Sequence, residues 1–489
     1  MATEPVPSAQ SHTPAVRRRR TNTGGGTPPG PGVRPAWAQV HSLYQPVVHL
    51  QTRTVIGYEA LARGPEGTDL YTPDALFAAA RARGTFGELD WACRIAAFDG
   101  AVKAHLPSTL ELFVNVEAAA LNAPPPPGAA AALSAAGGLS VVIELTERDL
   151  TGDVAGLLRA VERARAQGWR VALDDVGAAP ASLALLPFLR PEIIKLDLSL
   201  THTTTNTATV EILTAVTAEA ARTGATLLAE GIETEDHAQL AVRMGARLGQ
   251  GWLFGRPAPL PTFPMRAPPP SRQRPLINVA SRVLEAPPAA RTTTLGTPYS
   301  VVVASANTAN TAHTANTANT ANTAKGAQRV ATKPVLHAIS TQLERRALAQ
   351  GHSVVVLGAF QHARHFTGAT AQRYRDLAVH SSYVAAFATD LSPDPMPGVN
   401  GIALPADDPL VGQWCVLVVA PLFTGALIAA DLGDTSPDPQ RRFHFYVVYD
   451  RPTIIAAATT LLYRIPRPDS DRPQPPDHPP PWGHTGSHH

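Results

Sequence analysis

Short apolar runs alternate with longer Ala- and Leu-rich runs over the first half of the chain. The longer runs, most clearly residues 153–168 and 208–224, have the length and composition of helices. The short runs end in polar residues and predict six strands, at GYEAL (57–61), LFVNVE (112–117), VVIELTE (141–147), RVALDD (170–175), IIKLD (193–197) and LLAEGIE (227–233). Strands that alternate with helices indicate parallel pairing with helical crossovers. Seven or eight such repeats over about 220 residues predict an α/β fold, closed into a (β/α)8 TIM-like barrel.

A smaller α/β pattern follows in the second half of the chain. Strands are predicted at HSVVVLGAFQ, YVAAFATDL, WCVLVVAP and FHFYVVYD, and helices at 337–351, at RPTIIAAATTLLYRI and at 366–378, where Thr367 is the expected cap. The longest apolar stretch, residues 414–430, is shorter than the roughly 20 residues that cross a bilayer. We interpret it as a buried strand, a turn and a short second element, and we expect no membrane span.

Composition shifts divide the chain. Proline, of which there are 47 residues, is concentrated between the two patterned regions and at both ends. An Ala-Asn-Thr repeat has neither an apolar face nor charge, so we interpret it as a flexible surface insertion. The predicted partition is a disordered Arg/Pro/Gly-rich tail at 1–36, a barrel at 37–261, a Pro-rich linker at 262–295, a smaller α/β domain at 296–465 with the repeat at 306–324, and a disordered Pro/His-rich tail at 466–489.

Charge and cysteine content exclude several classes of protein. The 41 basic and 39 acidic residues nearly balance, so nothing overall attracts nucleic-acid polymers or anionic membranes. Cys93 and Cys415 lie in apolar surroundings and are too few for a disulfide framework, which favours buried thiols in a reducing compartment. The run Arg17–Arg20 has no apolar core beside it and does not resemble a signal peptide. We therefore expect a cytoplasmic protein.

Polar residues stand at the ends of the predicted strands. In a barrel these ends meet at one face, and the set comprises Glu59, Asn115, Glu144, Asp174, Asp175, Lys195 and Glu230. Crowded carboxylates are unfavourable without cations. Oxygen donors without Cys or His suit Mg²⁺ or Mn²⁺, and a pair of such ions favours phosphoester hydrolysis. Polar residues that merely mark where each strand leaves the core would explain one position, but not the repeated set.

The sequence blocks that carry these residues resemble a known family. YEALARG (58–64) resembles the signature of EAL domains, phosphodiesterases that linearise cyclic di-GMP. Six further blocks follow in the family's order: FVNVE, IELTE, LDDVG, IKLD, AEGIE and GQGWLFGRP. The preceding YQPVVHL (44–50) also matches the family's first strand, and the likeness covers about residues 37 to 261. Seven blocks in order are far more specific than one alone.

The resemblance implies a role for each matching residue. Glu59, Asn115, Glu144 and Asp174 would bind one Mg²⁺ or Mn²⁺ ion, and Asp174, Asp175 and Glu230 a second. Lys195 would act with Asp175 and Glu230 in catalysis, orienting the water that attacks phosphorus. Substrate contacts would come from Leu61, Arg63 and Gln250, while Glu147, Asp197 and Glu233 would support the ligands from behind. The implied product is linear pGpG, and the family's first strand runs antiparallel to the others.

The loop after the paired aspartates departs from the family pattern. Members usually carry a Phe-Gly-Thr-Gly-Tyr-Ser-Ser-like loop, which supports metal binding, substrate binding and dimer contacts. Here the loop reads VGAAPAS (176–182), so that only Gly177 and Ser182 match, hydroxyl groups are lost and a rigid proline is gained. Complete metal ligands beside an altered loop are compatible with slow turnover, with turnover gated by a partner, or with binding without hydrolysis.

The second half of the chain resembles the DICT sensory domain. The likeness rests on LGAFQHARHFTGATAQRYRDLA and DDPLVGQWCVLVVAPLFTGALIAADLGD, and it implies signal input without catalytic residues. The spacing of His362 and His365 allows one helix face, and His380 follows, but no carboxylate or cysteine pattern accompanies them, so surface or capping roles are favoured. Trp414 is expected to pack in the core.

The sequence thus predicts a cyclic di-GMP phosphodiesterase regulated by a DICT-type domain. The first alternative is a cyclic di-GMP receptor that does not hydrolyse its ligand, and the second is a scaffold with an inert barrel, which the complete acid set disfavours. The expected partners are cyclic di-GMP, a second copy of the barrel in a homodimer, and a signal or protein at the DICT-type domain. No GGDEF-like run is present, so synthesis of the nucleotide is not expected.

Overall fold

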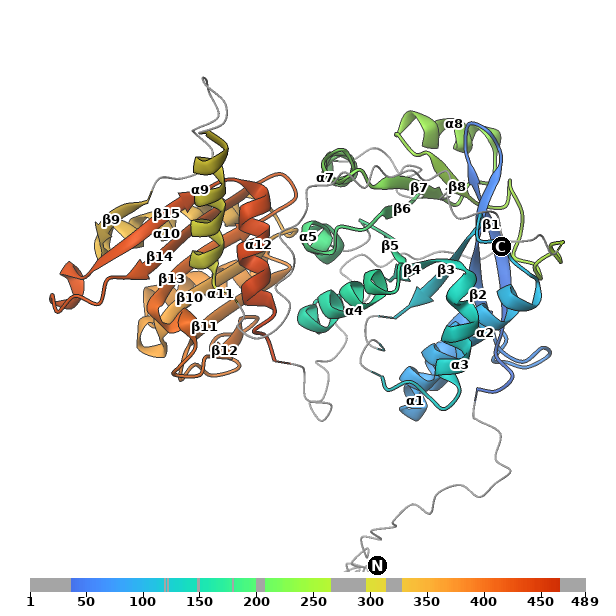
Figure 1. The fold of residues 1–489 in the computed structure, drawn as a ribbon, viewed down its shortest axis with the longest axis horizontal. Coiled ribbons are helices and arrows are strands. Elements are labelled where there is room, and N and C mark those ends of the chain that lie inside the picture. The colour runs from blue at the N-terminus through green and yellow to red at the C-terminus, as the bar shows by residue number, and fades with distance from the viewer. Residues whose placement is uncertain are drawn as a thin grey trace, which may run out of the picture. The chain divides into compact units, whose positions relative to one another are not determined.

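The computed structural model describes residues 37–117, 120, 123–146, 150–177, 180–198, 207–264, 296–313 and 328–466. Most of both predicted tails, most of the linker and the later part of the Ala-Asn-Thr repeat lie outside these residues. Two folded regions are described below, each by itself: a barrel and a second sheet with its helices (Figure 1).

The first region is a closed eight-stranded barrel. Its strands are β1 (His41–His49), β2 (Val55–Arg63), β3 (Glu111–Val116), β4 (Ser140–Leu145), β5 (Arg170–Leu173), β6 (Ile193–Asp197), β7 (Thr226–Glu230) and β8 (Leu248–Gln250). Strand β1 pairs antiparallel with both β2 and β8, whereas the pairs from β2 to β8 are parallel. The predicted TIM-like barrel and its reversed first strand are therefore confirmed.

Helices connect successive strands of the barrel, as the alternating pattern predicts. They are α1 (Pro73–Arg83), α2 (Phe86–Lys103), α3 (Ala129–Ala135), α4 (Val154–Ala166), α5 (Pro180–Leu189), α7 (Thr207–Thr223) and α8 (Glu235–Arg243). The sequence favours these boundaries locally: Asp153 caps α4 by accepting a hydrogen bond from the Gly156 backbone, and Thr234 caps α8 in the same way through His237. These two hydrogen bonds define where α4 and α8 begin.

One apolar residue from each strand fills the interior of the barrel. The eight side chains are almost completely buried and form a cluster of their own: Val47, Ile56, Phe113, Val142, Ala172, Ile193, Leu228 and Leu248. Because side chains alternate along a strand, the residue two positions further on points to the same interior. The apolar layer therefore forms a floor, and the next inward-facing residues form a layer above it.

The second region is a seven-stranded sheet in the order β12-β11-β10-β13-β14-β15-β9. Its elements are α9 (Pro298–His313), β9 (Arg329–Thr332), α10 (Lys333–Leu348), β10 (Val355–His362), α11 (Ala369–His380), β11 (Tyr383–Thr389), β12 (Asn400–Ala403), β13 (Gln413–Val419), β14 (Thr424–Asp431), β15 (Arg442–Val448) and α12 (Arg451–Leu462), with short 3-10 helices η3 (Ala363–His365), η4 (Pro409–Gly412) and η5 (Asp438–Gln440). Strands β10, β11 and β12 are parallel, and the remaining pairs are antiparallel.

Helices cover both faces of this sheet. In Figure 1, α9 and α12 cross the face turned toward the viewer, and α10 and α11 lie behind it. The alternation along β10 explains the two layers: Val356 and Phe360 pack in the same cluster as Leu343 of α10 and Tyr374 of α11, while Val355 and Leu357 face the other way. The smaller predicted α/β domain is thus a three-layer sandwich.

Three local predictions for this region need correction. Residues 424–431 are a full strand, β14, rather than a short second element. Thr367 does not cap α11; Gly368 occupies the cap position, and the Thr367 hydroxyl donates to the Arg364 carbonyl instead. Helix α9 runs to His313, so the repeat begins inside a helix, and residues 314–324 lie outside the described residues.

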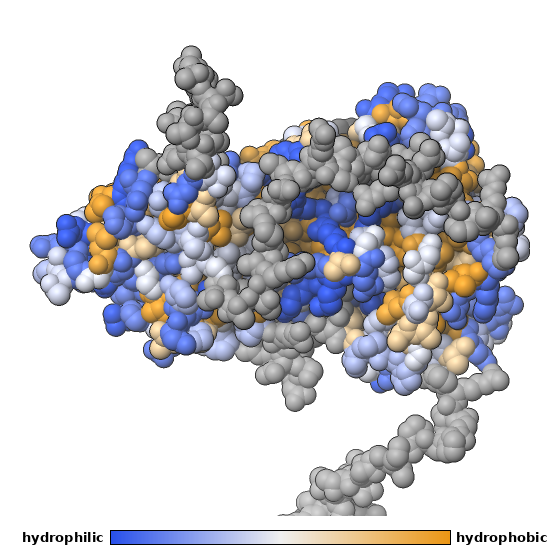
Figure 2. All heavy atoms as spheres, viewed as in Figure 1, coloured by the Kyte–Doolittle hydropathy of each residue, from blue (hydrophilic) through white to orange (hydrophobic). Residues whose placement is uncertain are grey.

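None of the helices in the described part of the chain combines the length and apolarity needed to cross a bilayer. On the face shown in Figure 2, hydrophobic residues form small separate patches among hydrophilic ones. Cys415 is completely buried, and burial raises the pKa of its thiol to about 12, which fits an unreactive core residue. Cys93 is half-buried.

Candidate functional site

A layer of polar side chains lies directly above the apolar floor of the barrel. Six side chains lie two positions further along their strand than the residue that the strand contributes to the apolar floor. They are Asn115, Glu144, Asp174, Lys195, Glu230 and Gln250. Glu59 joins them from β2, where the pairing with β1 shifts its register between Val47 and Val48, and Gln45 joins them from the reversed strand β1. Seven of the predicted site residues are thus brought to one end of the barrel by strand alternation alone.

Lys195 lies at the centre of this layer. Its Nζ atom is 2.7 Å from Glu230 Oε1, 2.8 Å from Glu144 Oε1 and 3.0 Å from Asp174 Oδ1. Glu59 Oε2 lies further away, at 3.6 Å. The lysine side chain is only 1 % exposed, so these carboxylates take the place of its hydration shell.

Glu59 is held from two sides by amide groups. Asn115 Nδ2 donates to Glu59 Oε1 at 2.9 Å, and Gln250 Nε2 donates to Glu59 Oε2 at 2.7 Å. The same Gln250 nitrogen lies 3.1 Å from Gln45 Oε1, and Gln45 Nε2 in turn donates to the Gly255 carbonyl. Both oxygens of Glu59 are therefore oriented before any ligand enters.

The carboxylates of the cluster differ in their electrostatics. Burial raises the pKa of Glu144 and of Glu230 well above the usual range, and the neighbouring Glu59 charge adds to the effect at Glu144. Burial acts the same way on Glu59, but Lys195 and the two amide hydrogen bonds outweigh it and lower its pKa. Burial alone would lower the pKa of Lys195, yet the surrounding carboxylates hold it well above its ordinary value. Lys195 is thus an ammonium group at neutral pH.

The rim of the cluster has the donor set of a hard divalent cation. One carboxylate oxygen each from Asp174, Asp175 and Glu230 lie within 4.8 Å of one another, the spacing that one ion can bridge. Gln250 Oε1 is buried and accepts no hydrogen bond from the described residues. Carboxylate and amide oxygens are the ligands that Mg²⁺ and Mn²⁺ prefer. The residues present therefore fit such an ion.

The altered loop VGAAPAS retains one specific hydrogen bond. Asp175 has a φ of 50° and Gly177 a φ of 106°, so the chain reverses sharply after β5. The Gly177 backbone N–H donates to Ser182 Oγ at 3.1 Å, and Ser182 is completely buried. Pro180 is the first residue of α5, where its fixed φ and missing N–H are favourable. The two residues that match the family pattern, Gly177 and Ser182, are the pair that holds the turn.

The remaining predicted site residues lie around the cluster. Leu61 and Arg63 follow Glu59 at two-residue spacing on the same face of β2, and both are half-buried. Arg63 Nη1 donates to the Ala62 carbonyl at 2.8 Å. Asp197 ends β6, and Glu233 is exposed in the loop before α8. Glu147 lies outside the described residues.

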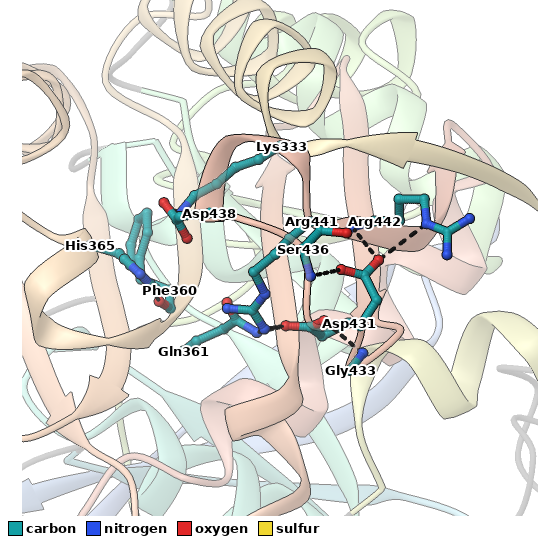
Figure 3. A network of polar contacts seen from close by, with 11 residues as sticks. Lys333, Phe360, Gln361, His365, Asp431, Gly433, Ser436, Asp438, Arg441 and Arg442 are labelled. Carbon is teal, nitrogen blue, oxygen red and sulfur yellow. Dashed lines mark hydrogen bonds and ion pairs between the residues drawn. The ribbon is translucent and has the colours of Figure 1, made fainter.

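Polar contacts in the second region brace the connection between β14 and β15 (Figure 3). Asp431 accepts hydrogen bonds from Gln361 and from the Gly433 backbone, and it forms an ion pair with Arg441. Asp434 pairs with Arg442, and Asp438 with Lys333. The three acidic side chains of this connection thus bind β10, the start of α10, or arginines at the end of the connection and the start of β15.

The predicted histidines do not share a helix face. His362 ends β10 and lies 2.8 Å from Thr389 Oγ1, whereas His365 lies in η3 with Nδ1 2.9 Å from the Phe360 carbonyl. Their rings are 5.8 Å apart, and His380 instead lies beside His352. In the described chain, the group of three His, Cys, Asp or Glu residues spaced to share an ion is the one in the barrel. Trp414 is half-buried against the core.

Sequence reasoning missed Gln45 as part of the site. It lies in the YQPVVHL block, but a glutamine in a strand gives no local signal of function. Its role becomes visible only once β1 closes the barrel against β8 and brings Gln45 and Gln250 together. Because β1 runs in the reverse direction, its site residue does not stand at the carboxyl end of the strand, where the other site residues were predicted.

Fold and site together define a TIM-like barrel that gathers carboxylates, amides and one lysine at the carboxyl ends of its parallel strands. The model of the EAL domain family matches residues 37–257, and that of the sensory domain in diguanylate cyclases and two-component systems, DICT, matches residues 313–432. The chain carries an EAL domain followed by a DICT domain. The matched ranges are narrower than the regions 37–261 and 296–465 predicted from composition, and those boundaries remain predictions.

Individual relatives share the barrel region. The cyclic di-GMP phosphodiesterase NbdA of Pseudomonas aeruginosa is 32% identical over 230 residues, which are 45% of this chain and 29% of that protein. An uncharacterized protein of Azorhizobium caulinodans is 31% identical over 227 residues, 44% of this chain and 31% of the relative. The chain thus spans about a third of the length of the curated relatives it matches. Among solved structures, a manganese and cyclic di-GMP complex of Klebsiella pneumoniae BlrP1 is 29% identical, with a TM-score of 0.40 over 45% of this chain and 56% of that one.

Proposed function

We propose that this protein is a divalent-metal-dependent phosphodiesterase that hydrolyses cyclic di-GMP to linear pGpG. The observation that carries the proposal is the cluster of four carboxylates around Lys195 at the carboxyl face of an EAL-type barrel. Relatives named as cyclic di-GMP phosphodiesterases support the choice of substrate. A cytoplasmic location agrees with this substrate and belongs to the proposal.

Two groups of residues would hold the metal ions. Glu59, Asn115, Glu144 and Asp174 would bind one Mg²⁺ or Mn²⁺ ion, and Asp174, Asp175 and Glu230 the other. Such ions lower the pKa of water and neutralise charge that develops on a phosphoryl group. The hydrogen bonds from Asn115 and Gln250 orient Glu59 in advance, which reduces the cost of ordering this ligand.

The other residues of the site would act on the substrate and the attacking water. Arg63, whose planar fork suits phosphate oxygens, and Leu61 would contact the nucleotide from β2. Lys195 would orient the water through its ammonium group, and Gln250 would help to place the substrate. Glu147, Asp197 and Glu233 would support the ligand-bearing loops. The DICT domain would regulate turnover in response to a signal or partner, and the barrel would form the contact in a homodimer.

One observation favours a second candidate function, that of a receptor which binds cyclic di-GMP without hydrolysing it. The loop VGAAPAS has lost hydroxyl groups that the family usually carries, although the hydrogen bond between Gly177 and Ser182 is present. Such a loop would leave the ligand cluster complete while removing contacts needed for turnover. The two functions differ in product formation and not in binding.

Asp174→Asn separates metal-dependent catalysis from folding. We expect at least about a hundredfold loss of pGpG formation, because this residue belongs to both proposed ligand groups, and a far-UV spectrum like that of the wild type. Asp99→Asn, an exposed position on α2, is the matched control and should retain full activity. Chromatographic detection of pGpG, with nucleotide binding measured in parallel, checks both variants. Unchanged turnover in Asp174→Asn would contradict the metal assignment, and binding without product in the wild type would favour the receptor.

A further inference from the structure

The four carboxylates around Lys195 have one cationic partner in the described part of the chain. Glu59, Glu144 and Lys195 are almost completely buried, so solvent ions screen their charges weakly. No other Lys, Arg or His side chain of the described residues forms an ion pair with any member of the cluster. Among the described residues, Lys195 is therefore the one cationic group that balances these four acids.

The ammonium group contacts carboxylates that are also proposed as metal ligands. It lies at hydrogen-bond distance from Glu144 of the first proposed ligand group, from Glu230 of the second and from Asp174, which belongs to both. A Mg²⁺ ion binds oxygen at about 2.0–2.1 Å and demands octahedral directions. A divalent ion and an ammonium group sharing these lone pairs would repel each other strongly in a buried site. Both cannot occupy the present contacts together.

We propose that Lys195 is a built-in counter-cation of the metal site, which holds the cluster closed until a divalent ion displaces it from part of its contacts. The inference rests on the proposed function, since it assumes that the cluster binds such ions. Lys195 then has two positions: in contact with these carboxylates without metal, and withdrawn from part of them with metal. The protein stays folded without metal, and its metal affinity is lower than the carboxylates alone would give.

Lys195→Met tests the proposal, because methionine is also unbranched, is about one heavy atom shorter and removes the charge. Without metal, the variant should melt on the order of 10 °C lower, since a buried charge cluster loses its one cationic partner among the described residues. Its affinity for Mn²⁺ alone, measured by calorimetry on the full chain at pH 8, should be at least about tenfold tighter than that of the wild type. Lys333→Met, which breaks the Lys333–Asp438 pair in the other region, should change neither the affinity nor its stoichiometry.

A second measurement uses the wild-type protein and does not depend on the variant folding. The sequence contains only four lysines, Lys103, Lys195, Lys325 and Lys333, so selective ¹⁵N labelling of lysine side chains gives few signals. A buried, hydrogen-bonded ammonium should exchange slowly and be visible without metal. Titration with Mg²⁺ should shift or remove this one signal while the other lysines remain unchanged.

The outcomes separate this proposal from the proposed function. Equal Mn²⁺ affinity in Lys195→Met and wild type, or a Lys195 signal unmoved by saturating Mg²⁺, would overturn the counter-cation role while metal-dependent hydrolysis stands. Failure of both proteins to bind Mn²⁺ would overturn the metal site itself, and with it both proposals. Tighter binding by the variant together with the Mg²⁺-dependent signal would support the counter-cation role even if no pGpG forms.

Discussion

Gly177 is the residue on which the turn after the paired aspartates depends most directly. Its φ of 106° is strained for any residue with a side chain, and a Cβ atom there would lie 2.5 Å from Cγ2 of Ile212 on α7. The Ser182 hydroxyl accepts the Gly177 N–H, so any movement of this residue also disturbs the start of α5. A loop that differs from the family pattern at most positions thus retains the residue with the least steric freedom.

Gly177→Ala should lower the free energy of unfolding by about 2–4 kcal/mol, from backbone strain and the clash with Ile212 together. Gly67 provides the matched control, since it has a φ of 73° but nothing within 4 Å of the position of its Cβ. Gly67→Ala should therefore show the backbone contribution alone, about 1 kcal/mol. Urea denaturation of both variants measures the difference. Equal losses in the two variants would show that the contact with Ile212 is not a constraint.

At the scale of single elements, the strands of the barrel were predictable because each short apolar run has a polar residue at or near its carboxyl end. The predicted strands coincide in position with β2 to β7. Strand β8, only three residues long, has too little pattern to be detected, and Gln250 was found through the family resemblance instead. Thr367 was chosen as a cap from residue type, whereas Gly368 can adopt the positive φ that this junction has.

The connection between β14 and β15 makes contacts that the hydrophobic pattern of the sequence does not predict. Residues 431–442 read as an ordinary polar loop in sequence, yet Asp431 reaches Gln361 on β10, a residue 70 positions earlier. Gln361 is itself buried at a φ of 63°, where β10 shifts its register against β11. Hydrogen bonds between such distant residues depend on the sheet order, which a single sequence does not encode locally.

Asp431→Ala should destabilise the second region by about 2–4 kcal/mol, because it leaves the buried Gln361 amide without its acceptor and removes the partner of Arg441. The exposed Gly433 N–H loses a hydrogen bond as well, but water can replace it. Asp407→Ala is the control, since Asp407 is exposed in the loop before η4. Thermal unfolding followed by circular dichroism checks the pair of variants. A loss no greater than that of Asp407→Ala would mean that the braced connection adds nothing to stability.

At the scale of the whole molecule, the sequence predicted two α/β regions and the chemistry of the first. The convergence of Asn115, Glu144, Asp174 and Glu230 followed from barrel closure, which places equivalent positions of every strand at one level. The central position of Lys195 did not follow, because it depends on which carboxylates its long side chain can reach. The signal to which the DICT domain would respond has no counterpart in a residue pattern, since that region gathers structural ion pairs rather than a site of recognised chemistry.

The most direct test of the account is cyclic di-GMP hydrolysis by the purified full-length protein with Mg²⁺ or Mn²⁺. Glu59→Ala removes the carboxylate that Asn115 and Gln250 orient, and Glu88→Ala changes an exposed glutamate on α2 as the matched control. We predict pGpG formation by the wild type and by Glu88→Ala, its loss with a chelator, and at least about a hundredfold less product from Glu59→Ala. Absence of pGpG from the wild type while the nucleotide binds, or undiminished turnover in Glu59→Ala, would contradict the account.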